Sequence, residues 1–187
     1  DSVTIKVNPK PVAGFTLNDS TQCFNGHQFS FSNSTSIDSG SLTYNWAFGD
    51  GNSSNLSSPN YSYSTPDTFQ VQLIATSDKN CGDTLSKTAY VFPSPDAQFS
   101  IADSQQCFDQ NQFNFNNTTS IASGYSDYLW HFGDSDTSTQ ENPSHVYVQD
   151  DTFQVKLIAT SDLNCLDSTE KTTYVFPSPQ ASFAVND

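Results

Sequence analysis

The chain has 187 residues, of which 20 are acidic and six are lysine, with no arginine, so its formal net charge is −14. This charge repels the phosphates of nucleic acids and excludes nucleic-acid binding as a function. The sequence contains no apolar run of about 18 residues, which excludes a membrane-spanning helix.

Apolar residues make up 34% of the chain, whereas aromatic residues alone make up 13%. This composition indicates a thin core built from Phe, Tyr and Trp, which suits a sandwich of two sheets. The sequence also lacks a signal peptide and any methionine, which is typical of an internal fragment of a longer protein.

An internal repeat organises the chain. Residues 15–98 and 99–182 align without a gap at an offset of 84 and share 46 identities. We therefore expect two modules of the same fold, at residues 11–94 and 95–178. Residues 1–10 match the last strand of a preceding repeat plus a linker, and residues 179–187 match the start of a further repeat.

Short strands separated by turn-rich stretches are predicted in the first module, and no segment has a helical period. They cover residues 14–17, 28–33, 42–48, 60–63, 68–76 and 84–92. The side chains predicted to form the core are Phe29, Phe31, Trp46, Phe48, Phe69, Val71 and Leu73, with Trp130 and Phe132 as the counterparts of Trp46 and Phe48 in the second module. The fold class is all-β.

The strand at 42–48 ends in Trp46-Ala47-Phe48 and is followed by Gly49-Asp50-Gly51, and further along the chain comes Asp67-Thr68-Phe69. This combination resembles the polycystic kidney disease (PKD) repeat, and the resemblance covers nearly all of both modules. It implies tandem immunoglobulin-like β-sandwiches. The second module departs from the pattern with Ser135 in place of the last glycine, a difference that lies in the turn.

Four cysteines, two at matched positions in each module, favour disulfides over metal ligation. The preferred pairing joins Cys23 to Cys81 and Cys107 to Cys165. In a plain immunoglobulin topology, however, the two cysteines of a module lie at opposite ends. The alternative joins Cys23 of one module to Cys165 of the next and would link the repeats covalently.

Asp50 and Asp134 follow the aromatic strand and precede a turn. Together with Asp136 in an Asp-x-Asp arrangement, Asp134 could ligate Ca²⁺. The favoured interpretation is an Asx-type turn, in which the carboxylate accepts backbone N–H groups and no cofactor is needed. The first module has Asn52 in place of Asp136, and Ca²⁺ takes six or more oxygens.

Positions that differ between the copies are expected to face solvent. Tyr61 becomes His145, His27 becomes Asn111, Ala47 becomes His131 and Ser41 becomes Tyr125. No set of nucleophile and base occurs in both copies, so we expect these residues to have no enzymatic activity.

The resemblance is to repeats of secreted and cell-surface proteins, including large Bacteroidetes adhesins. It implies an extracellular structural or adhesive segment that spaces and presents surface, with neighbouring repeats as its partners. Two alternatives stay open: a segment of a self-assembling fibre, or an accessory carbohydrate- or protein-binding module of a secreted hydrolase. A binding module predicts a strip of exposed aromatic side chains shared by both copies.

Overall fold

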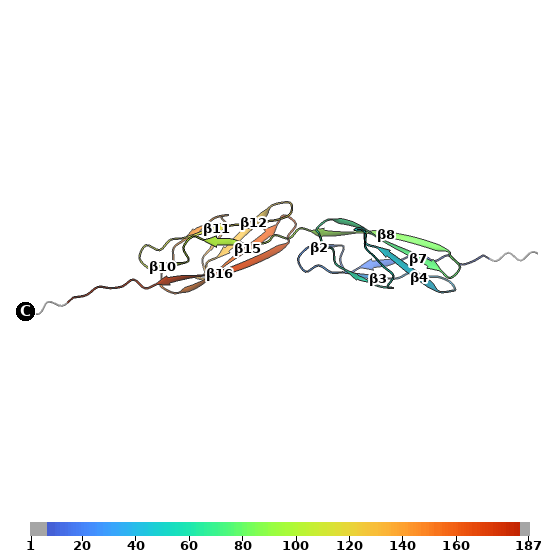
Figure 1. The fold of residues 1–187 in the computed structure, drawn as a ribbon, viewed down its shortest axis with the longest axis horizontal. Coiled ribbons are helices and arrows are strands. Elements are labelled where there is room, and N and C mark those ends of the chain that lie inside the picture. The colour runs from blue at the N-terminus through green and yellow to red at the C-terminus, as the bar shows by residue number, and fades with distance from the viewer. Residues whose placement is uncertain (1–6, 184–187) are drawn as a thin grey trace, which may run out of the picture. The chain divides into compact units, whose positions relative to one another are not determined.

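The computed structural model describes residues 7–183, which fold as two compact units divided between Phe92 and Pro93 (Figure 1). The strand expected within residues 1–10 and the further repeat expected at 179–187 fall largely outside the described residues. Within residues 7–183, no helix has the length and apolar character needed to span a membrane.

The first module contains eight strands. They are β1 (Phe15–Leu17), β2 (Thr21–Cys23), β3 (Phe29–Asn33), β4 (Leu42–Ala47), β5 (Ser53–Ser54), β6 (Asn60–Tyr61), β7 (Thr68–Ser77) and β8 (Gly82–Phe92). All six predicted strands are present. The sequence did not indicate β2 or β5, which are short and lack alternating apolar residues.

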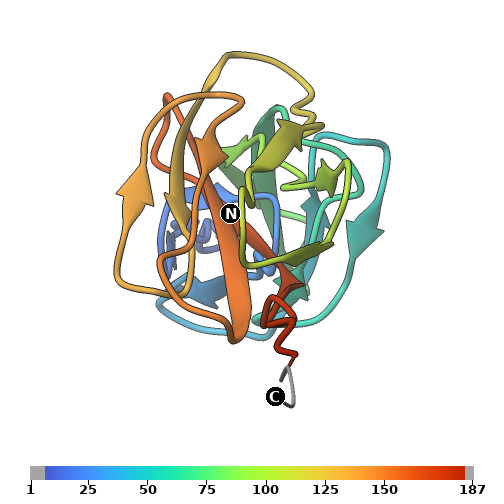
Figure 2. The same ribbon diagram turned by 90° about the vertical axis from the view of Figure 1, so that its left-hand side faces the viewer.

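The second module repeats the same strands at the same offset of 84 residues. They are β9 (Phe99–Ile101), β10 (Gln105–Cys107), β11 (Phe113–Asn117), β12 (Ser126–His131), β13 (Thr137–Ser138), β14 (Ser144–His145), β15 (Thr152–Ser161) and β16 (Leu166–Phe176). The long pair β15 and β16 is drawn as orange and red arrows in Figure 2.

Each module is an immunoglobulin-like β-sandwich of a three-stranded and a five-stranded sheet. In the first module the strand orders are β1-β3-β6 and β2-β8-β7-β4-β5, and in the second they are β9-β11-β14 and β10-β16-β15-β12-β13. β7 and β8 are antiparallel, whereas β2 runs parallel to β8 at the edge of the sheet. The fold class predicted from the sequence is therefore confirmed.

An aromatic core fills the space between the two sheets because every second side chain of a strand points inward. All the side chains predicted for the core are buried, Trp46, Phe48, Trp130 and Phe132 among them. Phe15 meets Trp46 edge to face with ring centroids 5.0 Å apart, and Phe99 meets Trp130 at the same distance. Each indole N–H donates to a backbone carbonyl 2.9 Å away, so burial leaves neither indole unsatisfied.

The two cysteines of each module lie at opposite ends of one long strand. Cys23 on β2 is paired with Phe92, the last residue of β8, whereas Cys81 immediately precedes the first residue of β8. Eleven residues separate these ends, which is roughly 33 Å at about 3.3 Å per residue. A disulfide needs Cα atoms about 4.4–6.8 Å apart.

The preferred pairing within each module is therefore wrong. The second module has the same geometry, because Cys107 is paired with Phe176 and Cys165 precedes β16. Cys81 and Cys107 carry free thiols, whereas Cys23 and Cys165 are disulfide-bonded. The topology that places the cysteines this way depends on β2 and β10, the edge strands that the sequence did not reveal.

Candidate functional site

The turn after β4 and β12 has the same backbone geometry in both modules. Gly49 and Gly133 have φ angles of 91° and 92°, a region that side chains rarely occupy. A Cβ atom at either glycine would lie 2.8 Å from a backbone carbonyl oxygen of β7 or β15. Only glycine fits here, and the aspartate that bonds to the turn follows it directly.

Asp50 and Asp134 both form the Asx-type turn. The carboxylate of Asp50 accepts the backbone N–H of Asn52 at 3.0 Å, and Asp134 accepts that of Asp136 at the same distance. The next residue, Gly51 in one module and Ser135 in the other, has a φ of 94° or 85°. The turn is therefore kept with serine, although serine must adopt a backbone conformation that is unfavourable for residues other than glycine.

In the first module, Asp50 is the centre of a polar network. The Tyr61 hydroxyl donates to the carboxylate at 2.6 Å, and the Asn52 side chain donates at 3.0 Å. Burial by itself would raise the pKa of Asp50, but the hydrogen bonds from Tyr61 and Asn52 outweigh it and lower that pKa. Burial, followed by the bond to Asp50, raises the pKa of Tyr61, which stays a neutral donor.

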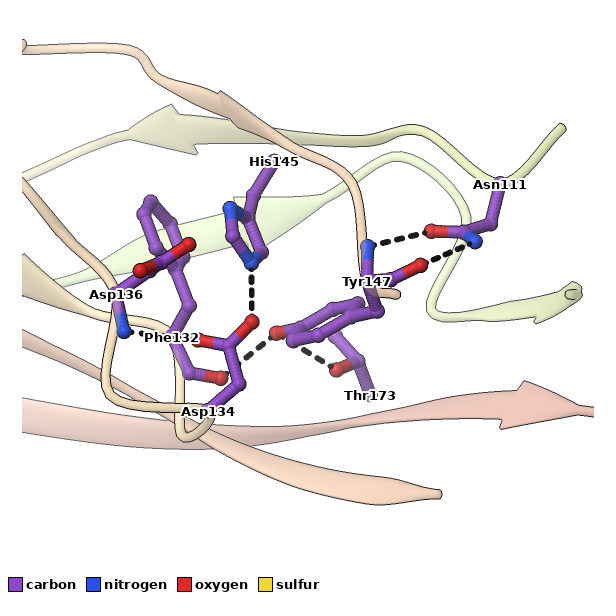
Figure 3. A network of polar contacts seen from close by, with 7 residues as sticks. All are labelled: Asn111, Phe132, Asp134, Asp136, His145, Tyr147 and Thr173. Carbon is purple, nitrogen blue, oxygen red and sulfur yellow. Dashed lines mark hydrogen bonds and ion pairs between the residues drawn. The ribbon is translucent and has the colours of Figure 1, made fainter. Parts of the chain in front are cut away.

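In the second module, His145 takes the place of the tyrosine. Its Nε2 lies 2.6 Å from the Asp134 carboxylate, and its ring stacks on Phe132 with centroids 4.2 Å apart (Figure 3). The corresponding Tyr61 ring stacks on Phe48 at 3.9 Å. Each module thus stacks a flat ring with a polar atom on the equivalent phenylalanine, and that polar atom contacts the equivalent carboxylate.

Within residues 7–183, Asp134, Asp136 and His145 form a group that could hold a metal ion. Each offers one ligand atom, and these atoms lie within 4.8 Å of one another. These three side chains by themselves supply fewer than the six to eight oxygens that Ca²⁺ takes, and one of them offers an imidazole nitrogen. The donor set does not fit Ca²⁺, and the Asp134 carboxylate already accepts two hydrogen bonds or ion-pair contacts.

A buried tyrosine supports the turn from below in each module. The Tyr63 hydroxyl donates to the Phe48 carbonyl at 2.9 Å, and the Tyr147 hydroxyl donates to the Phe132 carbonyl at 2.8 Å. Burial raises the pKa of both hydroxyl groups, that of Tyr147 to about 12, so they stay protonated donors. In the second module alone, Thr173 donates to the Tyr147 hydroxyl at 3.3 Å.

His27 and Asn111 hold the backbone of this tyrosine. The Tyr63 N–H donates to His27 Nε2 at 2.7 Å, and the Tyr147 N–H donates to Asn111 Oδ1 at 2.8 Å. His27 therefore carries its proton on Nδ1, which lies 2.6 Å from the Phe24 carbonyl. Asn111 donates its amide to the equivalent carbonyl of the second module.

The prediction that variable positions face solvent is correct for two pairs and wrong for two. Ala47, His131, Ser41 and Tyr125 are exposed. His145 and Tyr61 are half-buried, however, and Asn111 is only 4% exposed. These exchanges preserve a hydrogen bond rather than a residue type. The signal in the sequence was the constant spacing of eleven residues from the turn aspartate to a planar polar ring.

Paired aromatic side chains lie on the outer face of the five-stranded sheet in both modules. Tyr90 and Tyr174 are 39% and 38% exposed, and Phe176 is 47% exposed. The rings of Tyr90 and Phe92 lie 6.4 Å apart, and those of Tyr174 and Phe176 lie 6.3 Å apart. Because i and i+2 share a face of a strand, each pair forms a short apolar strip.

Comparison with known families gives the same match for both modules. The family model described as "PKD domain" matches residues 8–92 and again residues 93–176.

Similar proteins include a collagenase, a domain of a metalloprotease and a cell adhesion molecule with several immunoglobulin domains. Collagenase ColA of Bacillus cereus is 40% identical over 72 residues, which cover 38% of this chain and 7% of the collagenase. The PKD1 domain of the Vibrio cholerae metalloprotease PrtV is 32% identical, with a TM-score of 0.40, and covers 44% of this chain and 98% of that domain. Down Syndrome Cell Adhesion Molecule is 10% identical, with a TM-score of 0.54 over 93% of this chain and 25% of its own.

Proposed function

Because this chain belongs to the PKD domain family, we propose that its two modules are a non-catalytic accessory segment of a secreted hydrolase. The observation that carries this proposal is the 40% identity over 72 residues to Collagenase ColA. The chain spans only 7% of that collagenase, so the resemblance supports a role beside a catalytic domain rather than the catalysis itself. The proposal places the segment outside the cell, where a disulfide persists.

The accessory role we propose is attachment to an extracellular protein fibre. Tyr90, Tyr174 and Phe176 are exposed and Phe92 is half-buried, and the two ring pairs supply the shared aromatic strip expected of a binding module. Aromatic rings bury a large apolar area with little loss of side-chain entropy, so they suit flat, extended ligands. A single pair is small, and two modules of the same fold in tandem gain affinity through avidity.

Co-sedimentation of the chain with insoluble collagen fibres tests this proposal. We expect the wild type to sediment with the fibres, and a variant with Tyr90, Phe92, Tyr174 and Phe176 all changed to Ala to stay in solution. Tyr125→Ala is the matched control, because Tyr125 is a 64% exposed aromatic residue away from these strands. The binding role would be overturned if all three proteins sedimented equally with the fibres, or if the wild type did not sediment with them.

A structural spacer is the second candidate. The constant offset of 84 residues, which every strand follows, favours a repeat unit selected for regular length. Its partners would be neighbouring repeats of the same protein. A wild-type chain that binds neither collagen nor an insoluble polysaccharide such as cellulose, yet stays folded and monomeric, would favour the spacer over the binding module.

A further inference from the structure

The turn aspartate has different neighbours in the two modules, and the second module surrounds it with side chains that can ligate a metal ion. In the first module, Tyr61 and Asn52 donate hydrogen bonds to one oxygen of Asp50, at 2.6 and 3.0 Å. In the second module, His145 stands in place of the tyrosine and Asp136 in place of the asparagine. Two hydrogen-bond donors are thus exchanged for an imidazole and a second carboxylate.

This exchange places two negative charges close together. The ligand atoms of Asp134, Asp136 and His145 all lie within 4.8 Å of one another. Two carboxylates at this distance repel each other, and the net charge of −14 on the chain adds to the negative potential. A protonated imidazole offsets one of the two charges, whereas a divalent cation offsets both. The cluster therefore favours a doubly charged cation.

The side chains of His145 and Asp134 are already held in place for such an ion. The imidazole stacks on Phe132 with ring centroids 4.2 Å apart, and it packs edge to face with Tyr147 at 4.6 Å. Asp134 Oδ1 accepts the backbone N–H of Asp136, and Oδ2 lies 2.6 Å from His145 Nε2 (Figure 3). The two side chains are only 10% and 14% exposed, so they lose little conformational freedom when an ion binds.

The chemistry of the three ligand atoms selects the ion. Imidazole nitrogen suits Zn²⁺ and its first-row neighbours, whereas Ca²⁺ and Mg²⁺ take oxygen ligands. Zn²⁺ binds His and Asp at about 2.0–2.2 Å in a tetrahedron, which puts two ligand atoms roughly 3.2–3.6 Å apart. The separations in the cluster depart from this range by no more than about 1 Å. Rotation of the exposed Asp136 side chain covers a shift of this size.

We propose that the second module binds one Zn²⁺ ion through Asp134, Asp136 and His145. The ion takes the place of the proton between Nε2 and Oδ2, which is released to solvent, and Oδ1 of Asp134 keeps its backbone hydrogen bond. A water molecule completes the tetrahedron as the fourth ligand. The ion ties the turn after β12 to β14 and stabilises the second module, whereas the first module ties the same elements with hydrogen bonds.

Calorimetric titration of the chain with ZnCl₂ tests the site. Thiolates also ligate Zn²⁺, so the free thiols of Cys81 and Cys107 are alkylated first. We expect one saturable site per chain in the wild type. His145→Tyr combined with Asp136→Asn should weaken binding by at least about 100-fold, because loss of an outer-shell partner alone costs about 10–100-fold. These substitutions copy the first module, so the second module should stay folded.

Two controls separate coordination from general attraction to an acidic surface. His131→Ala removes an exposed imidazole of the same module that lies outside the cluster, and it should bind Zn²⁺ as the wild type does. CaCl₂ supplies an ion of the same charge, and Zn²⁺ but not Ca²⁺ should raise the Tm of the second module. Equal effects of the two ions, or loss of Zn²⁺ binding in His131→Ala, would overturn the assignment of the site.

The first module supplies the converse experiment. Tyr61→His combined with Asn52→Asp recreates the three ligands around Asp50 and should add a second Zn²⁺ site to the chain. The proposal would be overturned by a wild type without a saturable site, by a second-module variant that binds as the wild type does, or by a first-module variant that still binds one ion. Failure of collagen binding would leave these results unchanged, because the aromatic pairs supply no ligand.

Discussion

Replacing Tyr147 with Phe is expected to destabilise the second module by about 2–3 kcal/mol. The hydroxyl donates to the buried Phe132 carbonyl at 2.8 Å and accepts from the buried Thr173 at 3.3 Å. Removing it leaves two buried polar groups without partners, and one such group costs about 1–3 kcal/mol. A module of this size has a total stability of roughly 4–13 kcal/mol, so the loss is large.

The first module provides an internal comparison. Tyr63 makes the same bond to Phe48, but Ala89 stands where the second module has Thr173. Tyr63→Phe therefore leaves one buried polar group without a partner instead of two, and it should lower the free energy of unfolding less than Tyr147→Phe does. Adding Thr173→Val to Tyr147→Phe removes the unpartnered threonine hydroxyl at nearly constant side-chain volume and should recover part of the lost stability.

Calorimetry of the whole chain measures these effects, and we expect each variant to shift the transition of its own module because the modules are separate compact units. For a domain of this length, 2–3 kcal/mol corresponds to a fall in Tm of roughly 10–20 °C. Tyr174→Phe, at an exposed hydroxyl, is the matched control. If Tyr147→Phe shifts its transition no more than Tyr174→Phe does, the hydroxyl does not hold the turn as argued.

Three further predictions concern the turn. Ser135→Gly should stabilise the second module by about 1 kcal/mol, because serine is disfavoured at positive φ. Gly51→Ser should destabilise the first module by a similar amount. Urea midpoints that move in the opposite directions would show that serine is not strained at this position. The pKa of Asp50 is lower in the folded module than in the unfolded chain. Its contribution to stability is therefore fully present above the unfolded pKa of about 4 and is lost as the pH falls through the folded pKa. Asp50→Asn should flatten this acid dependence, and an unchanged slope of stability against pH would exclude the polar network as its cause. Calorimetric titration with Ca²⁺ should give no saturable heat, whereas a saturable heat that disappears in Asp134→Asn would reveal a site.

The sandwich and its core were predictable because their signals are local. Trp46 and Phe48 alternate within one strand, and the glycine and aspartate that follow them specify a turn. β2 was missed because Thr21–Cys23 has no such pattern and pairs with β8, some 70 residues later in the chain. An edge strand that is held by a distant partner leaves little trace in its own sequence.

The polar site was only half predictable. Asp50 and Asp134 stood out as the ends of a repeated motif, but their partners did not, because the two modules use different residues for one task. A hydroxyl on a phenol ring and a nitrogen on an imidazole ring reach the same carboxylate from the same stack on phenylalanine. Comparing residue types therefore suggested variable surface where the structure has a conserved contact.

The long strand β8 also determines how a module would respond to mechanical force. The chain leaves the module at the end of β8, which pairs with β7 from Gly82 to Tyr90 and with β2 from Tyr90 to Phe92. Tension applied along this strand loads its hydrogen bonds in parallel, as shear, and many must break together before the strand can slide. A module built this way resists pulling far better than one whose terminal strand could be unzipped bond by bond.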